Sequence, residues 1–196
     1  MTFRGLVLAG ILTAASAFAA PIYYTAVMNG PSESPANASP GTGFALVSID
    51  TVAHVMTVNV LFSGLTGTTT AAHIHSATAV AFTGTAGVAT TTPTFAGFPS
   101  GVTAGSYINT LDMSLASSYN PAFVTANGGT PLSAEAALAA GIANGQAYFN
   151  IHSTTFPGGE IRGFLIVAPE PGTFVLLGLS LLGLGFLRRT VNHSTR

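Results

Sequence analysis

The amino-acid sequence predicts an all-β domain, an antiparallel sandwich or barrel with one short helix, flanked by a signal peptide and a C-terminal apolar helix. Two observations predict the β architecture. Short runs rich in β-branched and aromatic residues recur along the chain, and clusters of Gly, Pro, Asn and Thr separate them. Strands at this spacing are typical of sandwiches and barrels.

The N-terminus has the layout of a secretory signal peptide. Arg4 precedes an apolar run from Gly5 to about Ala15, and the small-residue pattern Ala17-Phe18-Ala19 follows. This order predicts export and cleavage after Ala19. We therefore assign residues 1–19 to the signal peptide and residues 20–168 to a single folded domain. The sequence has no cysteine, so this exported domain relies on its core without disulfides.

The strands follow one another through the domain. Besides a run at residues 54–62, the expected strands are "IYYTAVMNG", "GFALVSID", "AHIHSA", "GSYINTLDM", "AYFNIHS" and "EIRGFLIV". Alternation is clearest at residues 54–62, where the face predicted to be buried consists of His54, Met56, Val58, Val60 and Phe62. The Thr-rich stretch 66–94 and the segment 97–105 are predicted to be loops that protrude from the sandwich.

One helix interrupts the strands. Ser133 is the expected N-cap, Glu135 is placed in the first turn, and Asn144-Gly145 ends the run "AEAALAAGIA". This helix is predicted to lead the chain into the last hairpin.

The last hairpin, "YFNIHSTTFPGGEIRGFL", has a register that its apolar residues select. Pairing symmetric about Phe156 places His152 opposite Glu160, Asn150 opposite Arg162 and Tyr148 opposite Phe164. The other face then consists of Phe149, Ile151, Ile161 and Leu165 and forms core. A slip by one residue would bury Glu160 and Arg162 without partners.

His73 and His75 are the candidate site residues. They are two apart in a strand, so their side chains project side by side, which suits a pair of metal ligands. If this strand lies beside the last hairpin, His152 supplies a third imidazole, with Glu160 as fourth ligand or as an orienting partner for copper or zinc. Alternatively, the histidines bond to loop carbonyls or acids, and Glu160 pairs with Arg162 to fix the hairpin. His54 and His193 are not placed in a site.

Charge excludes one class of partner. Between residues 20 and 168 the only strong base is Arg162, against five acids, which gives a formal charge of −4. Nucleic-acid binding needs several cations to neutralise phosphates, so we expect no nucleic-acid partner. The chain also lacks Gly-x-Ser-x-Gly, phosphate-loop and His-Glu-x-x-His motifs, and we predict no enzyme activity.

The C-terminus combines Pro169-Glu170-Pro171, an uncharged apolar stretch at 173–187 and the basic pair Arg188-Arg189. As a helix the apolar stretch would be about 22 Å long, somewhat shorter than a bilayer core of about 30 Å. The arginines would lie on the cytoplasmic side. Residues 169–196 resemble the PEP-CTERM sorting signal of Gram-negative bacteria. That resemblance implies processing by an exosortase, a transient anchor in the inner membrane, and release to the cell surface, outer membrane or extracellular matrix.

The domain itself resembles a CHRD domain, the module first described in chordin. The matching blocks are "AVMNGPSESP", "GTGFALVSID", "FSGLTGTTTAAHIHSA" and "GQAYFNIHSTTFPGGEIRGFL". The resemblance implies an all-β exported module. Together the two resemblances predict a non-catalytic binding or structural protein of the cell surface or exopolysaccharide matrix, with an exopolysaccharide or a surface protein as partner. The alternatives are a copper- or zinc-binding sandwich that uses the His-x-His strand, and a module that self-associates.

Overall fold

The computed structural model describes residues 20–169. The predicted signal peptide (1–19), Glu170 and Pro171 of the sorting motif, the apolar stretch 173–187 and the basic pair Arg188-Arg189 lie outside the described residues. No helix in the described part of the chain is long and apolar enough to cross a membrane.

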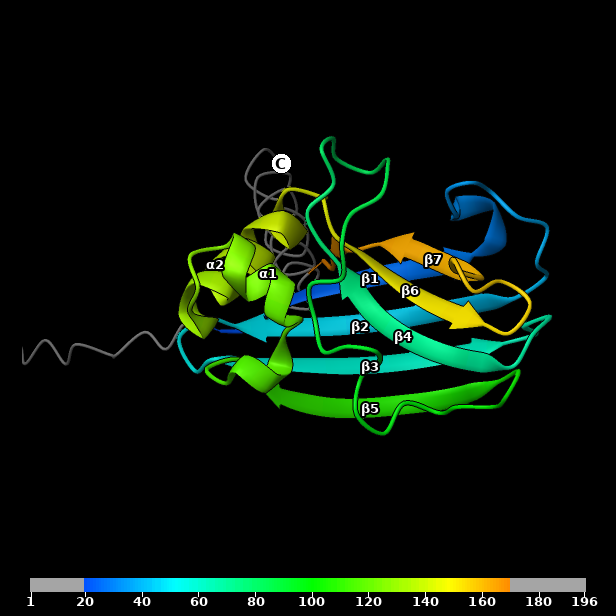
Figure 1. Ribbon diagram of the computed structural model, residues 1–196, viewed down its shortest axis with the longest axis horizontal. Coiled ribbons are helices and arrows are strands. Elements are labelled where there is room, and N and C mark those ends of the chain that lie inside the picture. The colour runs from blue at the N-terminus through cyan, green and yellow to red at the C-terminus, as the bar shows by residue number, and fades with distance from the viewer. Residues whose placement is uncertain (1–19, 170–196) are drawn as a thin grey trace, which may run out of the picture.

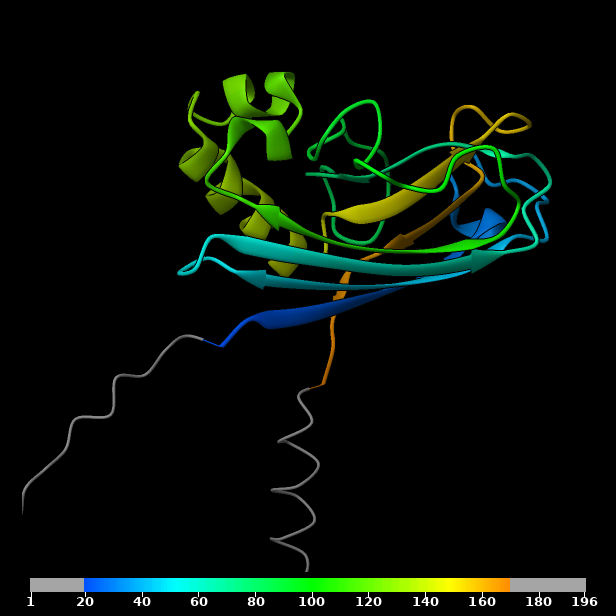
Figure 2. The same ribbon diagram turned by 90° about the horizontal axis from the view of Figure 1, so that it is seen from below.

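The domain is built on one antiparallel sheet of eight strands (Figure 1). The strands are β1 (Ile22–Asn29), β2 (Thr42–Asp50), β3 (Val55–Ser63), β4 (Thr69–His75), β5 (Gly105–Asp112), β6 (Tyr148–Ser153), β7 (Ile161–Phe164) and β8 (Ile166–Val167). Their order across the sheet is β4-β6-β7-β1-β2-β3-β5, and β8 pairs with β1. The sheet curls like half a barrel, so β4, β6 and β7 lie over β1, β2, β3 and β5 (Figure 2). The predicted all-β class is confirmed.

The core lies between the two halves of the curled sheet. Met56, Val58 and Val60 of β3 have no exposed surface, and Phe62 is buried, as the alternation predicted. His54 is the exception on this face. It lies in the turn before β3 with a φ of 56°, and its Nδ1 is 2.6 Å from a carboxylate oxygen of Glu135. The positive φ takes His54 out of the strand, so its side chain does not follow the alternation.

The last hairpin has the predicted register. Tyr148 pairs with Phe164 and Asn150 with Arg162. The apolar face has no exposed surface and consists of Phe149, Ile151, Ile161 and Leu165. Gly163 lets β7 approach β1 closely, because a Cβ atom there would come within 2.3 Å of the carbonyl oxygen of Val27. Burial of one apolar face therefore selects the pairing.

The helical region begins earlier than predicted. The main helix, α2 (Pro131–Ala143), has Thr130 as its N-cap instead of Ser133. Ser133 is the third helical residue, and Thr130 and Ser133 form a reciprocal capping box around Pro131. Glu135 therefore follows the first turn; it is buried and bonded to His54. The short helix α1 (Pro121–Ala126) and the 3-10 turns η1 (Gly30–Ser32) and η2 (Ala116–Ser118) were not predicted.

The Thr-rich segment packs more closely than a protruding loop. After β4 the chain returns along the free edge of that strand. The N–H of Ile74 donates to the hydroxyl of Thr90, and the N–H of Ala72 donates to that of Thr94, each at 2.9 Å. The N–H of Ala89 in turn donates to the carbonyl of Ile74. Threonine hydroxyls thus take the place of a neighbouring strand and protect the edge of the sheet.

Candidate metal centre

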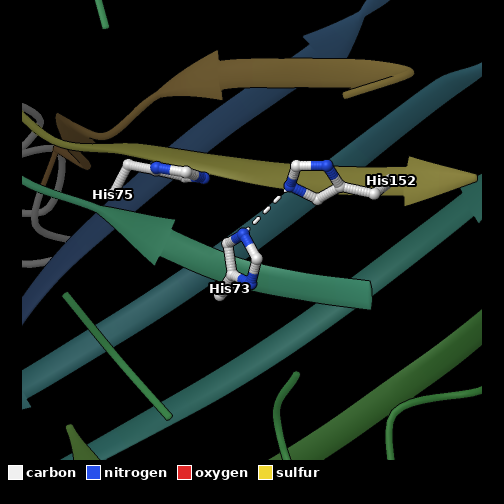
Figure 3. Close-up of side chains that lie close together, drawn as sticks. All are labelled: His73, His75 and His152. Carbon is white, nitrogen blue, oxygen red and sulfur yellow. Dashed lines mark hydrogen bonds between the residues drawn. The ribbon is translucent and has the colours of Figure 1, made fainter. Parts of the chain in front are cut away.

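Strand pairing brings the three predicted histidines together. β4 pairs with β6 so that Ala71 lies opposite His152, His73 opposite Asn150 and His75 opposite Tyr148. Ala72 and Ile74, which alternate with the histidines along β4, point into the core. All three imidazoles therefore lie on the side of the sheet away from the core, where they face one another (Figure 3).

Loops cover this cluster. His73 is only 6% and His75 only 9% exposed, although both point away from the core. The chain that follows β4 lies beside them: Nδ1 of His75 bonds to the carbonyl of Ala86, and Nδ1 of His73 to that of Pro93. His152 is half-buried, and its Nδ1 bonds to the carbonyl of Pro157 in the β6–β7 loop. The site is thus closed by loops from two parts of the chain.

The hydrogen bonds fix the tautomer of each ring. The three Nδ1-to-carbonyl distances are 3.1 Å for His73, 2.8 Å for His75 and 2.9 Å for His152. A carbonyl oxygen only accepts, so each Nδ1 carries the proton and each neutral ring presents a lone pair at Nε2. The ligand atoms of the three rings lie within 4.8 Å of one another, and the Nε2 atoms of His73 and His152 are 2.9 Å apart.

Electrostatics keep the rings neutral. Burial, assisted by the neighbouring His75 and His152, lowers the pKa of His73 to about 3. Burial likewise lowers the pKa of His75 to about 4, and it lowers the pKa of His152. Two facing Nε2 lone pairs at 2.9 Å have no proton to share in this state. Nε2 of His75 is buried and has no hydrogen-bond partner among residues 20–169. A metal ion binds nitrogen lone pairs that converge and have no other partner, as these do.

Aromatic and cationic side chains flank the cluster. The ring of His75 stacks on that of Tyr148 with centroids 4.6 Å apart, and the guanidinium of Arg162 lies 4.7 Å from the Tyr148 centroid. Arg162 also donates to the carbonyls of Ser32 and Gly84. Its ion-pair partner is Glu33, at 3.8 Å, and not Glu160 as predicted.

Glu160 lies outside the histidine cluster. Its fully buried carboxylate accepts from the hydroxyl of Ser39 at 2.6 Å and from the N–H groups of Thr66 and Gly67. Burial alone would raise the pKa of Glu160, but hydrogen bonds to these groups and to Ser153 bring it below its usual range. The predicted pairing with Arg162 is wrong because the loop before β2 and the link between β3 and β4 supply closer donors. The same contacts account for its absence from the ligand group.

Glu33 was missed by the sequence reasoning. Its side chain is buried beside Arg162, and one carboxylate oxygen has no hydrogen-bond partner within the described residues. Burial raises the pKa of Glu33 to about 7, against the opposing charge of Arg162. The only available signal was the block "AVMNGPSESP", which contains Glu33 but does not indicate its contact with a strand far along the chain.

Comparison with known families gives two matches. A model of the CHRD domain matches residues 24–165, and a model of the PEP-CTERM protein-sorting motif matches residues 167–189. No curated protein and no solved structure matches the chain. Both resemblances noted in the sequence are confirmed.

Proposed function

The chain belongs to the CHRD domain family, and from this premise we propose that it is a non-catalytic module that binds one copper or zinc ion. The PEP-CTERM motif makes it an exosortase-sorted extracellular protein of a Gram-negative bacterium. We place the mature protein at the cell surface or in the exopolysaccharide matrix. Detection of the protein in isolated matrix, against its recovery only in the medium, tests this location.

The observation that carries the metal proposal is the orientation of the imidazoles. Each Nδ1–H is held by a backbone carbonyl, so the Nε2 atoms of the three rings face one another (Figure 3), and the ligand atoms lie within 4.8 Å of one another. Metal-ligating histidines have this arrangement, in which a second acceptor fixes the ring. A set of histidines that only stabilised a fold would use its Nε2 atoms as well, yet Nε2 of His75 has no partner within the described residues.

One distance in the cluster suits copper, which is the ion that we expect. Two nitrogens that each lie about 2.0 to 2.1 Å from one ion are about 2.9 Å apart at a right angle and about 3.3 Å apart at the tetrahedral angle. The Nε2 atoms of His73 and His152 are 2.9 Å apart. Right angles suit tetragonal Cu(II), which also binds nitrogen ligands more tightly than Zn(II) does.

Binding without catalysis is the simplest use of this site. A hydrolytic zinc site would normally hold a carboxylate near the metal as general base. Among the described residues, no carboxylate joins the three histidines, and the nearby loop contacts leave two of the rings almost without solvent exposure.

Metal content tests the proposal. Purified protein is dialysed against equimolar Cu(II) and Zn(II), freed of loose ions, and analysed for both elements. We expect one ion per chain, mostly copper, and none in the His73→Ala/His75→Ala/His152→Ala variant. The matched control, His54→Asn, removes a histidine outside the cluster at a positive φ that asparagine tolerates, and should bind like the parent. A folded triple variant that still holds one ion, or a parent that holds none, would refute the site.

A further inference from the structure

One face of the sheet is open. The sheet curls around the core, and the helices and the long β4–β5 connection lie on the side of β4, β6 and β7 or at the ends of the strands (Figure 2). We call the outward-pointing residues of β1, β2, β3 and β5 the open face. Within residues 20–169, no segment covers it.

The open face carries an exposed apolar side chain on each of its four strands. In an antiparallel sheet with one face in water, outward positions are expected to be polar. Here Val27, Phe44 and Leu61 lie opposite one another on three adjacent strands and are 70%, 44% and 59% exposed. Ile108 on β5 is 71% exposed. Contiguous apolar surface of this kind marks an interaction site.

Charge is confined to one end of the open face. Between these apolar side chains, its remaining outward positions are Thr, Ser, Asn, Tyr, Leu and Val residues, and its only carboxylates are Asp50 and Asp112 at the ends of β2 and β5. No lysine or arginine lies on it. A partner held by opposite charge therefore does not fit, whereas an apolar or neutral interface does.

The position of the sorting motif identifies the partner as a lipid bilayer. β8 pairs with β1 at the margin of the open face, and the PEP-CTERM match begins at Val167, the last residue of β8. The uncharged stretch 173–187 follows after no more than about 20 Å of extended chain. When that stretch is in the membrane, the domain is held at the bilayer surface.

A second copy of the chain fits less well. Four strands about 4.8 Å apart and about 28 Å long present roughly 500 Å² of sheet face. A stable protein interface takes about 800 Å² from each partner. In projection the face is small for a lasting dimer, and it suits a contact that the anchor keeps in place.

We propose that, while the sorting segment anchors the protein, the open face lies on the membrane surface and contacts neutral lipid through Val27, Phe44, Leu61 and Ile108. The histidine cluster lies on β4 and β6, which form the other half of the curled sheet (Figure 2), and its imidazoles point away from the core (Figure 3) and so away from the bilayer. Cleavage of the sorting segment would release the protein, and with it the open face, from the membrane surface. The proposal does not depend on the metal.

Fluorescence tests the contact, because the chain contains no tryptophan. The full chain carrying Phe44→Trp is reconstituted in phosphatidylcholine vesicles, with or without bromine on the acyl chains. We expect the tryptophan in vesicles to emit at a shorter wavelength than a tryptophan exposed to water. We also expect brominated lipid to quench this emission strongly. Ile108→Trp is a second reporter on the same face, in case the first substitution disturbs folding.

The control reporter is Phe82→Trp. Phe82 is 59% exposed and packs on Phe164, on the histidine side of the sheet, so it should not be quenched by brominated lipid. Equal quenching of all three reporters, or none at the open face, overturns the proposal. A shift in emission that grows with the number of chains per vesicle, without quenching, would instead assign the face to a second copy and also overturns it.

Discussion

Three backbone carbonyls determine what the histidines can do. The carbonyls of Ala86, Pro93 and Pro157 each hold one Nδ1–H, and so turn each Nε2 toward the cluster. None of these carbonyls belongs to a strand; they lie in the loop after β4 and in the β6–β7 loop. The strands bring the imidazoles together, but the loops select the tautomer on which metal binding depends.

Glu160→Gln tests whether the Glu160 carboxylate stabilises the fold or binds the metal. The substitution removes the charge that Ser39, Thr66 and Gly67 stabilise in a fully buried position. Hydrogen bonds to charged groups contribute about 1.5 to 3 kcal/mol, so we expect the free energy of unfolding to fall by about that amount. Copper affinity should be unchanged. Urea titration and calorimetry measure the two quantities, and loss of affinity with stability retained would return Glu160 to the ligand set.

The positions of strands β4 and β7 depend on small side chains. Thr90 and Thr94 complete the free edge of β4 with hydroxyl groups, and this fixes the strand that carries His73 and His75. At the other side of the hairpin, Gly163 allows β7 to lie against β1. β7 carries Arg162, whose guanidinium lies over Tyr148 beside the site. Small changes in either element should therefore reach the histidine cluster.

Gly163→Ala tests this close approach. The added Cβ would meet the backbone oxygen of Val27, which cannot rotate away, so β7 must move from β1. Overpacking of this kind costs about 1 to 3 kcal/mol, and we expect a loss of stability in that range in urea titrations. The matched control is Gly158→Ala in the loop of the same hairpin, where an added Cβ meets nothing within 4 Å. Equal stabilities for the two variants would contradict the role assigned to Gly163.

At the scale of the whole molecule, local patterns predicted the strands and the approach of His152 to His73 and His75, whereas the contact of Glu33 with Arg162 escaped prediction. The apolar face of the last hairpin selected its register, and the His-x-His spacing predicted a shared direction for His73 and His75. Glu33 and Arg162 are far apart in the sequence, and nothing local links them. Thr130 and Ser133 both suit an N-cap; Pro131 at the first helical position was the signal that favoured Thr130.

The buried histidines also set how the whole fold responds to acid. In an unfolded chain each imidazole takes up a proton near pH 6.5, whereas in the metal-free folded protein the pKa of His73 is about 3 and that of His75 about 4. The unfolded state therefore binds more protons below pH 6.5, and stability falls as the pH falls toward 4. Glu33 acts in the opposite direction, since its folded pKa of about 7 lets the folded state hold an extra proton between pH 7 and 4.5. Because at least two histidines oppose one glutamate, the net effect is a loss of stability as the pH falls.

We therefore expect the metal-free protein to lose stability from pH 6.5 to pH 4.5, by about 1.4 kcal/mol per pH unit for each proton by which the two states differ. Urea titrations in EDTA at several pH values measure this slope. Replacing His73, His75 and His152 by Gln should remove it and leave the weaker, opposite slope of Glu33, which Glu33→Gln should abolish in turn. An unchanged slope in the triple variant would mean that these imidazoles are not buried in the neutral form. The proposed arrangement of their Nε2 lone pairs would then be wrong.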